Sequence, residues 1–211
     1  GDVAAAVEAL QAKGVTAFGQ SVDVGDGDAL KAWVEASAEA LGGIDCLVSN
    51  VSGGNSPGEE GWRANFEHDV LGAVRLVEAC MPYLENSDNA SIAMISSTAA
   101  LEKFISAGAY NAMKAAVIQY AGALAQDVGA KGIRVNAISP GPIMIEGGSW
   151  DFIKQNMTPF YEATLADIPV GRMGTAQEVA AQIALLASPL GSFTTATNIV
   201  FDGGITKRIQ F

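Results

Sequence analysis

The sequence SIAMISSTAALEKFISAGAYNAMKAAVIQYAGALAQDVGAKGIRVNAISPG, residues 91–141, holds two short apolar runs with a long helical pattern between them. The runs Ser91–Ser96 and Ile133–Ile138 are rich in β-branched residues and predict strands, whereas residues 107–130 predict a helix. A strand, a helix and a second strand of these lengths form a unit in which the two strands are parallel and joined by a right-handed crossover.

The same alternation continues on both sides of this unit. Strands that are apolar on both faces are typical of a parallel sheet covered by helices on both sides. We therefore predict an α/β fold with a doubly wound, Rossmann-like parallel sheet in three αβα layers, in one domain over residues 1–211. The further strands are expected at Thr16–Val22, Ile44–Ser49 and Asn198–Phe201, and the further helices at 2–13, 27–41, 60–86 and 176–187.

Charge and composition exclude several classes of protein. The 211 residues carry 12 basic and 23 acidic side chains, a net charge of −11, which disfavours binding to nucleic acid or to an anionic membrane. Cys46 and Cys80 make no disulfide framework and are expected as buried, reduced thiols. The N-terminus lacks a signal-peptide pattern, and the uncharged stretch 179–201 is interrupted by Pro189 and Gly191. We expect a soluble, cytoplasmic protein.

Small, polar or turn-forming residues follow the predicted strands. In doubly wound sheets, ligands bind outside the carboxyl ends of the strands, so one crevice is expected to collect these segments. They are Asp23–Val24, Asn50–Gly53, Ser97–Thr98 and Pro140–Ile143. The run 23–28 contains three aspartates but lacks the spacing and final glutamate of a calcium loop, so no metal is expected.

The most specific chemical signal is the pair Tyr110 and Lys114 on the predicted helix 107–130, with Ser97 upstream. A spacing of four places both side chains on one helix face, where the ammonium can favour the phenolate. A tyrosine needs such help, because its pKa of about 10 makes it a poor base at neutral pH. Ser97 at a strand end is placed to hydrogen-bond the oxygen that the tyrosine protonates, which is general-acid carbonyl chemistry.

Together these motifs resemble the short-chain dehydrogenase/reductase family, and in style its 3-oxoacyl-carrier-protein-reductase-like members. The resemblance covers nearly the whole chain. Its elements are Asp23-Val24, Leu47-Val48-Ser49-Asn50, Ser97, Tyr110-Asn111-Ala112-Met113-Lys114, Arg134-Val135-Asn136-Ala137-Ile138-Ser139-Pro140-Gly141 and Asp202-Gly203-Gly204.

The resemblance implies hydride transfer between NAD or NADP and a small carbonyl or alcohol substrate, with Tyr110 as the acid or base. Lys114 would then bind the nicotinamide ribose and Ser97 would orient the carbonyl. A substrate lid is implied at 146–167, and a homodimer or homotetramer through helices 60–86 and 107–130. The implied cofactor contacts are Asp23 and Val24 at the adenine, Asn50, Val51 and Ser52 at the ribose, Tyr110 and Lys114, and Pro140, Gly141 and Ile143 at the nicotinamide.

The chain departs from the family pattern at its start. No glycine-rich phosphate loop follows a predicted strand, and residue 1 falls where the family's second strand has ended. We therefore expect the first two strands, a βαβ unit of about 30 residues, to be missing. Either the chain is incomplete, or the remaining strands or another subunit fill the gap.

Three substitutions fall within the expected site. Asp69 stands where the family has a catalytic asparagine, Ser49-Asn50-Val51-Ser52 replaces Asn-Asn-Ala-Gly, and Ile145 replaces a frequent threonine. Asp69 is expected either to support the relay near Lys114 or to pair with that lysine and weaken its effect on Tyr110; a solvated helix residue is the third alternative. These departures leave open a non-catalytic family member that acts in assembly or ligand binding, and an isomerase or dehydratase on the same scaffold.

Overall fold

The computed structural model describes residues 2–54, 56–105 and 107–209. Its main sheet has the strand order β1-β2-β3-β6, and all neighbouring strands are parallel. The α/β prediction is confirmed. The strands are β1 (Cys46–Ser49), β2 (Ser91–Ile95), β3 (Arg134–Pro140) and β6 (Asn198–Phe201).

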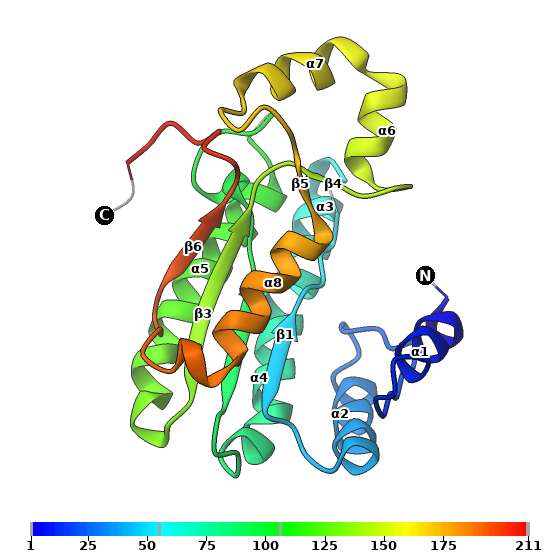
Figure 1. Cartoon of the computed structure of the whole chain (residues 1–211), viewed down its shortest axis with the longest axis vertical. Helices are drawn as coiled ribbons and strands as arrows, with labels where there is room; N and C mark the ends of the chain where they lie inside the picture. The colour runs from blue at the N-terminus through cyan, green and yellow to red at the C-terminus, as the bar shows by residue number, and fades with distance from the viewer. Residues whose placement is uncertain (1, 55, 106, 210–211) are drawn as a thin grey trace.

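Helices cover both faces of this sheet (Figure 1). On one face, α4 (Gly72–Leu84) contacts β1 and α5 (Ala109–Val128) contacts β3, while α2 (Gly27–Leu41) packs against α4. On the other face, α8 (Ala176–Ala187) contacts β2 and β3. The chain therefore forms three layers.

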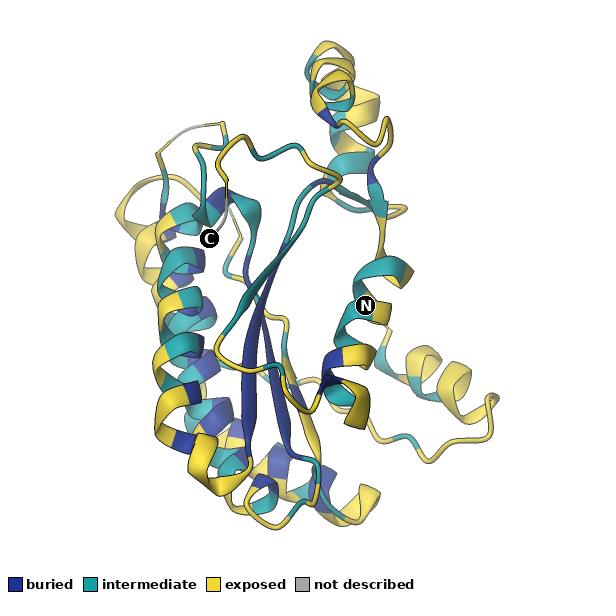
Figure 2. Ribbon diagram, turned by 60° about the vertical axis from the view of Figure 1, so that its left-hand side comes forward, coloured by how far each residue is buried: buried dark blue, intermediate teal, exposed yellow. Residues whose placement is uncertain are grey.

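The core follows the alternation of strand side chains. Ala137 on β3 points into the cluster shared with α2, α4 and α5, whereas its neighbour Ile138 packs with Leu186 of α8. Figure 2 shows buried residues along the middle strands and on the inner sides of the flanking helices. The two middle strands, β2 and β3, are thus buried on both faces.

The prediction of a strand at Thr16–Val22 is wrong. The segment is extended but belongs to no strand, because no strand of the described chain lies beside it to form a ladder. Only Val22 and, just beyond it, Val24 pack against the core. The preceding helix α1 (Val3–Gln11) contributes no buried residue.

The helix predicted at 60–86 is divided into three parts. They are α3 (Gly58–Asn65), the π-helical turn η1 (Phe66–Leu71) and α4. The turn η1 widens the helix where Asp69 lies, and such π-turns often occur at functional sites.

The remaining elements surround the carboxyl ends of the strands or cap the helices. Helices α6 (Ser149–Asn156) and α7 (Thr158–Asp167) occupy the predicted lid, and β4 (Ile143–Met144) pairs with β5 (Gly174–Thr175) below them. In the described residues, no helix combines the length and apolarity needed to cross a membrane. The short 3-10 turns are η2 (Thr98–Ala100), η3 (Gly129–Lys131) and η4 (Pro189–Gly191).

Candidate active site

The structure brings Ser97, Tyr110 and Lys114 together. Tyr110 and Lys114 lie in the first turns of α5, and the Lys114 ammonium is 5.8 Å from the centre of the Tyr110 ring. Ser97 follows β2 as the N-cap of η2, where its hydroxyl accepts a hydrogen bond from the Ala99 N–H at 3.1 Å. Parallel topology places the end of β2 beside the start of α5, so the three groups share one region, as predicted.

A cavity of about 510 Å³ opens at these residues, within the range of about 300–1,000 Å³ usual for small-molecule sites. One wall carries Ser97 and Tyr110, and another is the turn from Pro140 to Ile143 that follows β3. The rest is formed chiefly by Ser52, Glu102, Lys103, Phe104, Ile145, Trp150, Ile205 and Thr206.

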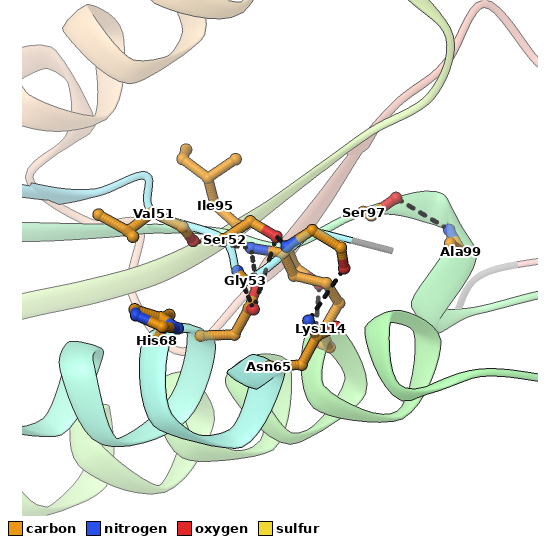
Figure 3. Close-up of polar contacts among 12 residues, drawn as sticks. Val51, Ser52, Gly53, Asn65, His68, Ile95, Ser97, Ala99 and Lys114 are labelled. Carbon is orange, nitrogen blue, oxygen red and sulfur yellow. Dashed lines mark hydrogen bonds and ion pairs between the residues drawn. The ribbon is translucent and has the colours of Figure 1, made fainter. Parts of the chain in front are cut away.

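Lys114 is the centre of a buried polar network (Figure 3). Its ammonium lies 2.9 Å from Asp69 Oδ1, and it donates to the carbonyl of Val51 at 3.3 Å and of Ile95 at 3.0 Å. The contact with Asp69 is an ion pair, and the other two are hydrogen bonds to backbone carbonyls. Of the two roles expected for Asp69, pairing with the lysine is the one that the structure contains, and the solvated alternative is wrong because the carboxylate has no exposed surface.

The surroundings raise the pKa of Tyr110 above its ordinary value. Burial is the main cause, because it disfavours the charged phenolate. Hydrogen bonding with Ser97 lowers the pKa, while the negative charge of Asp69 raises it further. The net direction is the opposite of the one expected from a free lysine beside the phenol.

The predicted cofactor residues divide into two groups. Ser52, Pro140, Gly141 and Ile143 line the cavity with Tyr110. Gly141 is required there, since a Cβ would lie 2.6 Å from the Cβ of Asp202 in the C-terminal segment.

The other predicted cofactor residues lie elsewhere. Val51 faces Lys114 only through its carbonyl, and Asn50 is exposed at the end of β1, outside the cavity lining that the structure describes. Asp23 and Val24 lie against η1 and α4 instead: Asp23 Oδ1 is 3.5 Å from His68 Nε2, and a side chain on Gly72 would press on Val24. The structure does not place these two residues at the cavity.

Several site residues were missed by the sequence argument. Asn65 is almost completely buried and donates a hydrogen bond to the Gly54 carbonyl at 2.9 Å. The sequence feature that could have indicated it is its position one helical turn before Asp69. Glu102 lines the cavity and accepts from the Lys207 and Arg208 N–H groups at 2.6 and 2.7 Å, which no motif indicated.

The chain's own residues fit the nicotinamide half of a dinucleotide. The Pro140–Ile143 turn lines the same cavity as Tyr110 and Ser97, and it is closely packed at Gly141. Lys114 fits a ribose less well, because its ammonium is already paired with the Asp69 carboxylate and donates hydrogen bonds to two backbone carbonyls.

A parallel sheet with helices on both faces and a serine–tyrosine–lysine group at the carboxyl ends of its strands define a Rossmann-like α/β oxidoreductase. The family model described as Enoyl-(Acyl carrier protein) reductase matches residues 1–206. The chain belongs to the short-chain dehydrogenase/reductase family.

Individual relatives agree with this assignment. The chain is 45% identical over 197 residues to isoepoxydon dehydrogenase patN of Penicillium expansum, covering 92% of this chain and 76% of that protein. It is 30% identical over 209 residues to 7alpha-hydroxysteroid dehydrogenase of Escherichia coli, covering 97% and 80%. An NADPH-bound short chain oxidoreductase from Pseudomonas aeruginosa, described as containing an atypical catalytic center, superposes with a TM-score of 0.86 at 28% identity, covering 98% of this chain and 84% of that one.

Proposed function

We propose that this protein interconverts a carbonyl and an alcohol with NAD or NADP, using Tyr110 as the general acid and base. The observation that carries the proposal is the meeting of Ser97, Tyr110 and the Pro140–Ile143 turn on one cavity. Relatives named as dehydrogenases and a neighbour solved with NADPH support the same chemistry.

Each group has a distinct task in this proposal. The bound nicotinamide supplies a hydride to the carbonyl carbon or accepts one from the alcohol. Tyr110 gives its phenolic proton to the substrate oxygen as that oxygen gains negative charge, and takes it back in the oxidation direction. The hydroxyl of Ser97 donates a second hydrogen bond to the same oxygen.

The raised pKa of Tyr110 sets a direction of pH dependence. A phenol that stays protonated to alkaline pH is a competent acid over the neutral range, so reduction is expected to persist there. Oxidation needs the phenolate and is expected to increase as the pH rises toward the pKa of Tyr110.

The test is turnover of a panel of small ketones, aldehydes and alcohols with NADH, NADPH and their oxidised forms. Tyr110→Phe is expected to lower turnover by about 100-fold or more while the melting temperature stays near that of the parent. Tyr120→Phe, on the same helix, is the matched control and is expected to retain activity. Full activity of Tyr110→Phe would overturn the proposal.

A second candidate function rests on the engaged state of Lys114. If its network with Asp69, Val51 and Ile95 never opens, the cavity binds a ligand without turnover. Calorimetric titration with both reduced cofactors separates the candidates: binding with turnover supports the oxidoreductase, whereas binding with no turnover of any substrate in the panel supports the binding protein.

A further inference from the structure

One carboxylate oxygen of Asp69 is ion-paired and the other accepts a hydrogen bond. Oδ1 lies 2.9 Å from the Lys114 ammonium, and Oδ2 accepts from the Gly53 N–H at 2.8 Å. The hydroxyl of Ser52 lies 3.5 Å from the same Oδ2. The side chain of Asp69 has no exposed surface, so these donors are its whole polar environment among the described residues.

This environment suits a carboxylate and not an amide. An ionised aspartate accepts hydrogen bonds at both oxygens, whereas asparagine offers one acceptor and an NH₂ group. In this geometry the NH₂ of an asparagine would point either at the Lys114 ammonium or at the Gly53 N–H. In both cases two hydrogen-bond donors would face each other. The Gly53 backbone packs closely against α3, since a Cβ there would lie 2.6 Å from the Ala64 carbonyl oxygen.

The pairing also defines what Lys114 can do. Its charge is partnered by Asp69, and its other two donors are directed at backbone carbonyls on the Val51 and Ile95 side. The ammonium therefore faces η1 and the strand ends, while the Tyr110 ring centre is 5.8 Å away. A cation held beside a carboxylate at 2.9 Å gives the phenol little net positive field.

We propose that Asp69 is a positioning residue that joins Lys114 and the Ser52–Gly53 turn in one network and neutralises the ammonium that would otherwise favour the ionised form of Tyr110. The effect of this pairing on turnover rests on the function proposed above. The effect on Tyr110 itself belongs to the free protein and needs neither cofactor nor substrate.

Few other charges face Tyr110. Glu102 and Lys103, which follow η2, line the cavity. The carboxylate and guanidinium of the Glu59–Arg63 pair on α3 are both exposed. The buried charges beside the phenol are therefore those of η1 and α5. The charged groups on the elements packed around Tyr110 are Asp69, Lys114, Glu102, Lys103, Glu59, Glu60 and Arg63.

The test is the titration of Tyr110 followed by NMR with ¹³Cζ-labelled tyrosine, its signal assigned by Tyr110→Phe. In the parent protein the signal is expected to change only above the ordinary pH range of tyrosine. In Asp69→Asn the midpoint is expected to fall by about one pH unit or more, because Lys114 loses its buried counter-charge. An unchanged midpoint in a folded Asp69→Asn protein would overturn the proposal.

The matched control is Glu78→Gln on α4. Glu78 raises the pKa of a different tyrosine, Tyr120, in addition to the main effect of burial. This variant is expected to shift the Tyr120 signal and leave Tyr110 in place. A Tyr110 shift as large as that of Asp69→Asn would mean that any lost carboxylate has this effect, and would contradict a specific role for Asp69.

The double variant Asp69→Asn with Lys114→Met removes both charges and serves if the single variant does not fold. If Asp69 neutralises Lys114, Tyr110 in the double variant is expected to titrate at or below the parent midpoint. A midpoint clearly above that of the parent would show that Lys114 lowers the pKa of Tyr110 despite Asp69, and would overturn the proposal.

Turnover provides a separate reading. In Asp69→Asn the pH profile of the oxidation direction is expected to move to lower pH by the same amount as the titration. A protein that shows the NMR shift but turns over no substrate would sink the proposed function and leave the role of Asp69 intact. Turnover of substrate without an NMR shift would leave the proposed function intact and overturn the role of Asp69.

Discussion

The Lys114 ammonium and the Asp69 carboxylate lie 2.9 Å apart, with 5% and 0% of their side chains exposed. Water cannot replace either partner at such depth. Removing one member of a buried pair leaves an uncompensated charge, which typically costs about 3–5 kcal/mol, far more than the loss of a surface pair.

Lys114→Met is therefore expected to lower the free energy of unfolding by about 3 kcal/mol or more, because the Asp69 carboxylate is left buried without its cation. Urea unfolding followed by circular dichroism at neutral pH measures the change.

The control for this change is Lys131→Met, which breaks an ion pair at 2.6 Å with Glu85 on the surface. Exposed pairs contribute about 0–1 kcal/mol, so this variant should stay close to the parent. Equal losses for the two lysine variants would contradict the strong dependence on burial.

The central fold could be predicted from sequence because its signals are local. The apolar runs that became β2 and β3 are buried on both faces, and a run of that kind between helical patterns has few other solutions. The spacing of Tyr110 and Lys114 likewise fixed their shared helix face. Features that depend on local sequence patterns were therefore predicted correctly.

The errors concern features that depend on a distant partner. Thr16–Val22 has the composition of a strand, but strand formation needs a neighbour that the described chain does not provide. The π-turn at Phe66–Leu71 is marked by no proline or glycine inside it. The sequence left two roles open for Asp69. Its pairing with Lys114 follows from the Gly53 N–H that donates to its carboxylate and from the strand-end carbonyls that accept from the ammonium, whose directions no sequence pattern encodes.

Ser97→Ala tests the second hydrogen bond to the substrate oxygen. The change removes the hydroxyl beside Tyr110 and is expected to lower turnover by about 100-fold or more, as loss of an oxyanion donor does elsewhere. Steady-state rates with the best substrate of the panel measure it.

The matched control for Ser97 is Ser188→Ala. Ser188 caps η4 as Ser97 caps η2, by accepting from the Leu190 N–H at 3.2 Å. It lies at the C-terminal end of α8 and is not part of the cavity lining that the structure describes. Both variants should lose a similar cap contribution, of about 0.5–2 kcal/mol, and only Ser97→Ala should lose activity. Parallel losses of activity would show that the cap, and not the catalytic hydroxyl, matters.

Phe160→Leu tests whether α6 and α7 shape the cavity. Trp150 stacks on Phe160 with ring centres 6.0 Å apart and 9° between planes, and Phe104 packs within 6.0 Å of Trp150. Because Trp150 and Phe104 line the cavity, loss of the stacking partner is expected to raise KM several-fold while kcat changes less. Phe152→Leu, on α6 with an exposed ring, should leave KM unchanged; equal effects would contradict a role for the stack.

The prediction that both thiols are buried is confirmed for Cys80 and wrong for Cys46, so their reactivity is expected to differ. Burial raises the pKa of Cys80 to about 11, so its reactive thiolate is scarce at neutral pH, whereas Cys46 on β1 is exposed. A chromogenic thiol reagent at pH 8 should modify one thiol in the folded protein and two in urea. Cys46→Ser should remove the fast reaction; a fast reaction that persists in this variant would place Cys80 at the surface.

The same raised pKa links Cys80 to alkaline stability. An unfolded chain ionises its thiol near pH 8.5, while the folded chain keeps Cys80 protonated until about pH 11. The unfolded state therefore binds fewer protons in this interval, and the stabilising effect of the buried thiol is present below pH 8.5 and is lost as the pH rises toward 11. Cys80→Ala is expected to flatten the fall in melting temperature over this range, with Cys46→Ser as the control that leaves it unchanged. An equally steep fall in Cys80→Ala would assign the alkaline limit to other groups, with the buried Tyr110 phenol next to be tested.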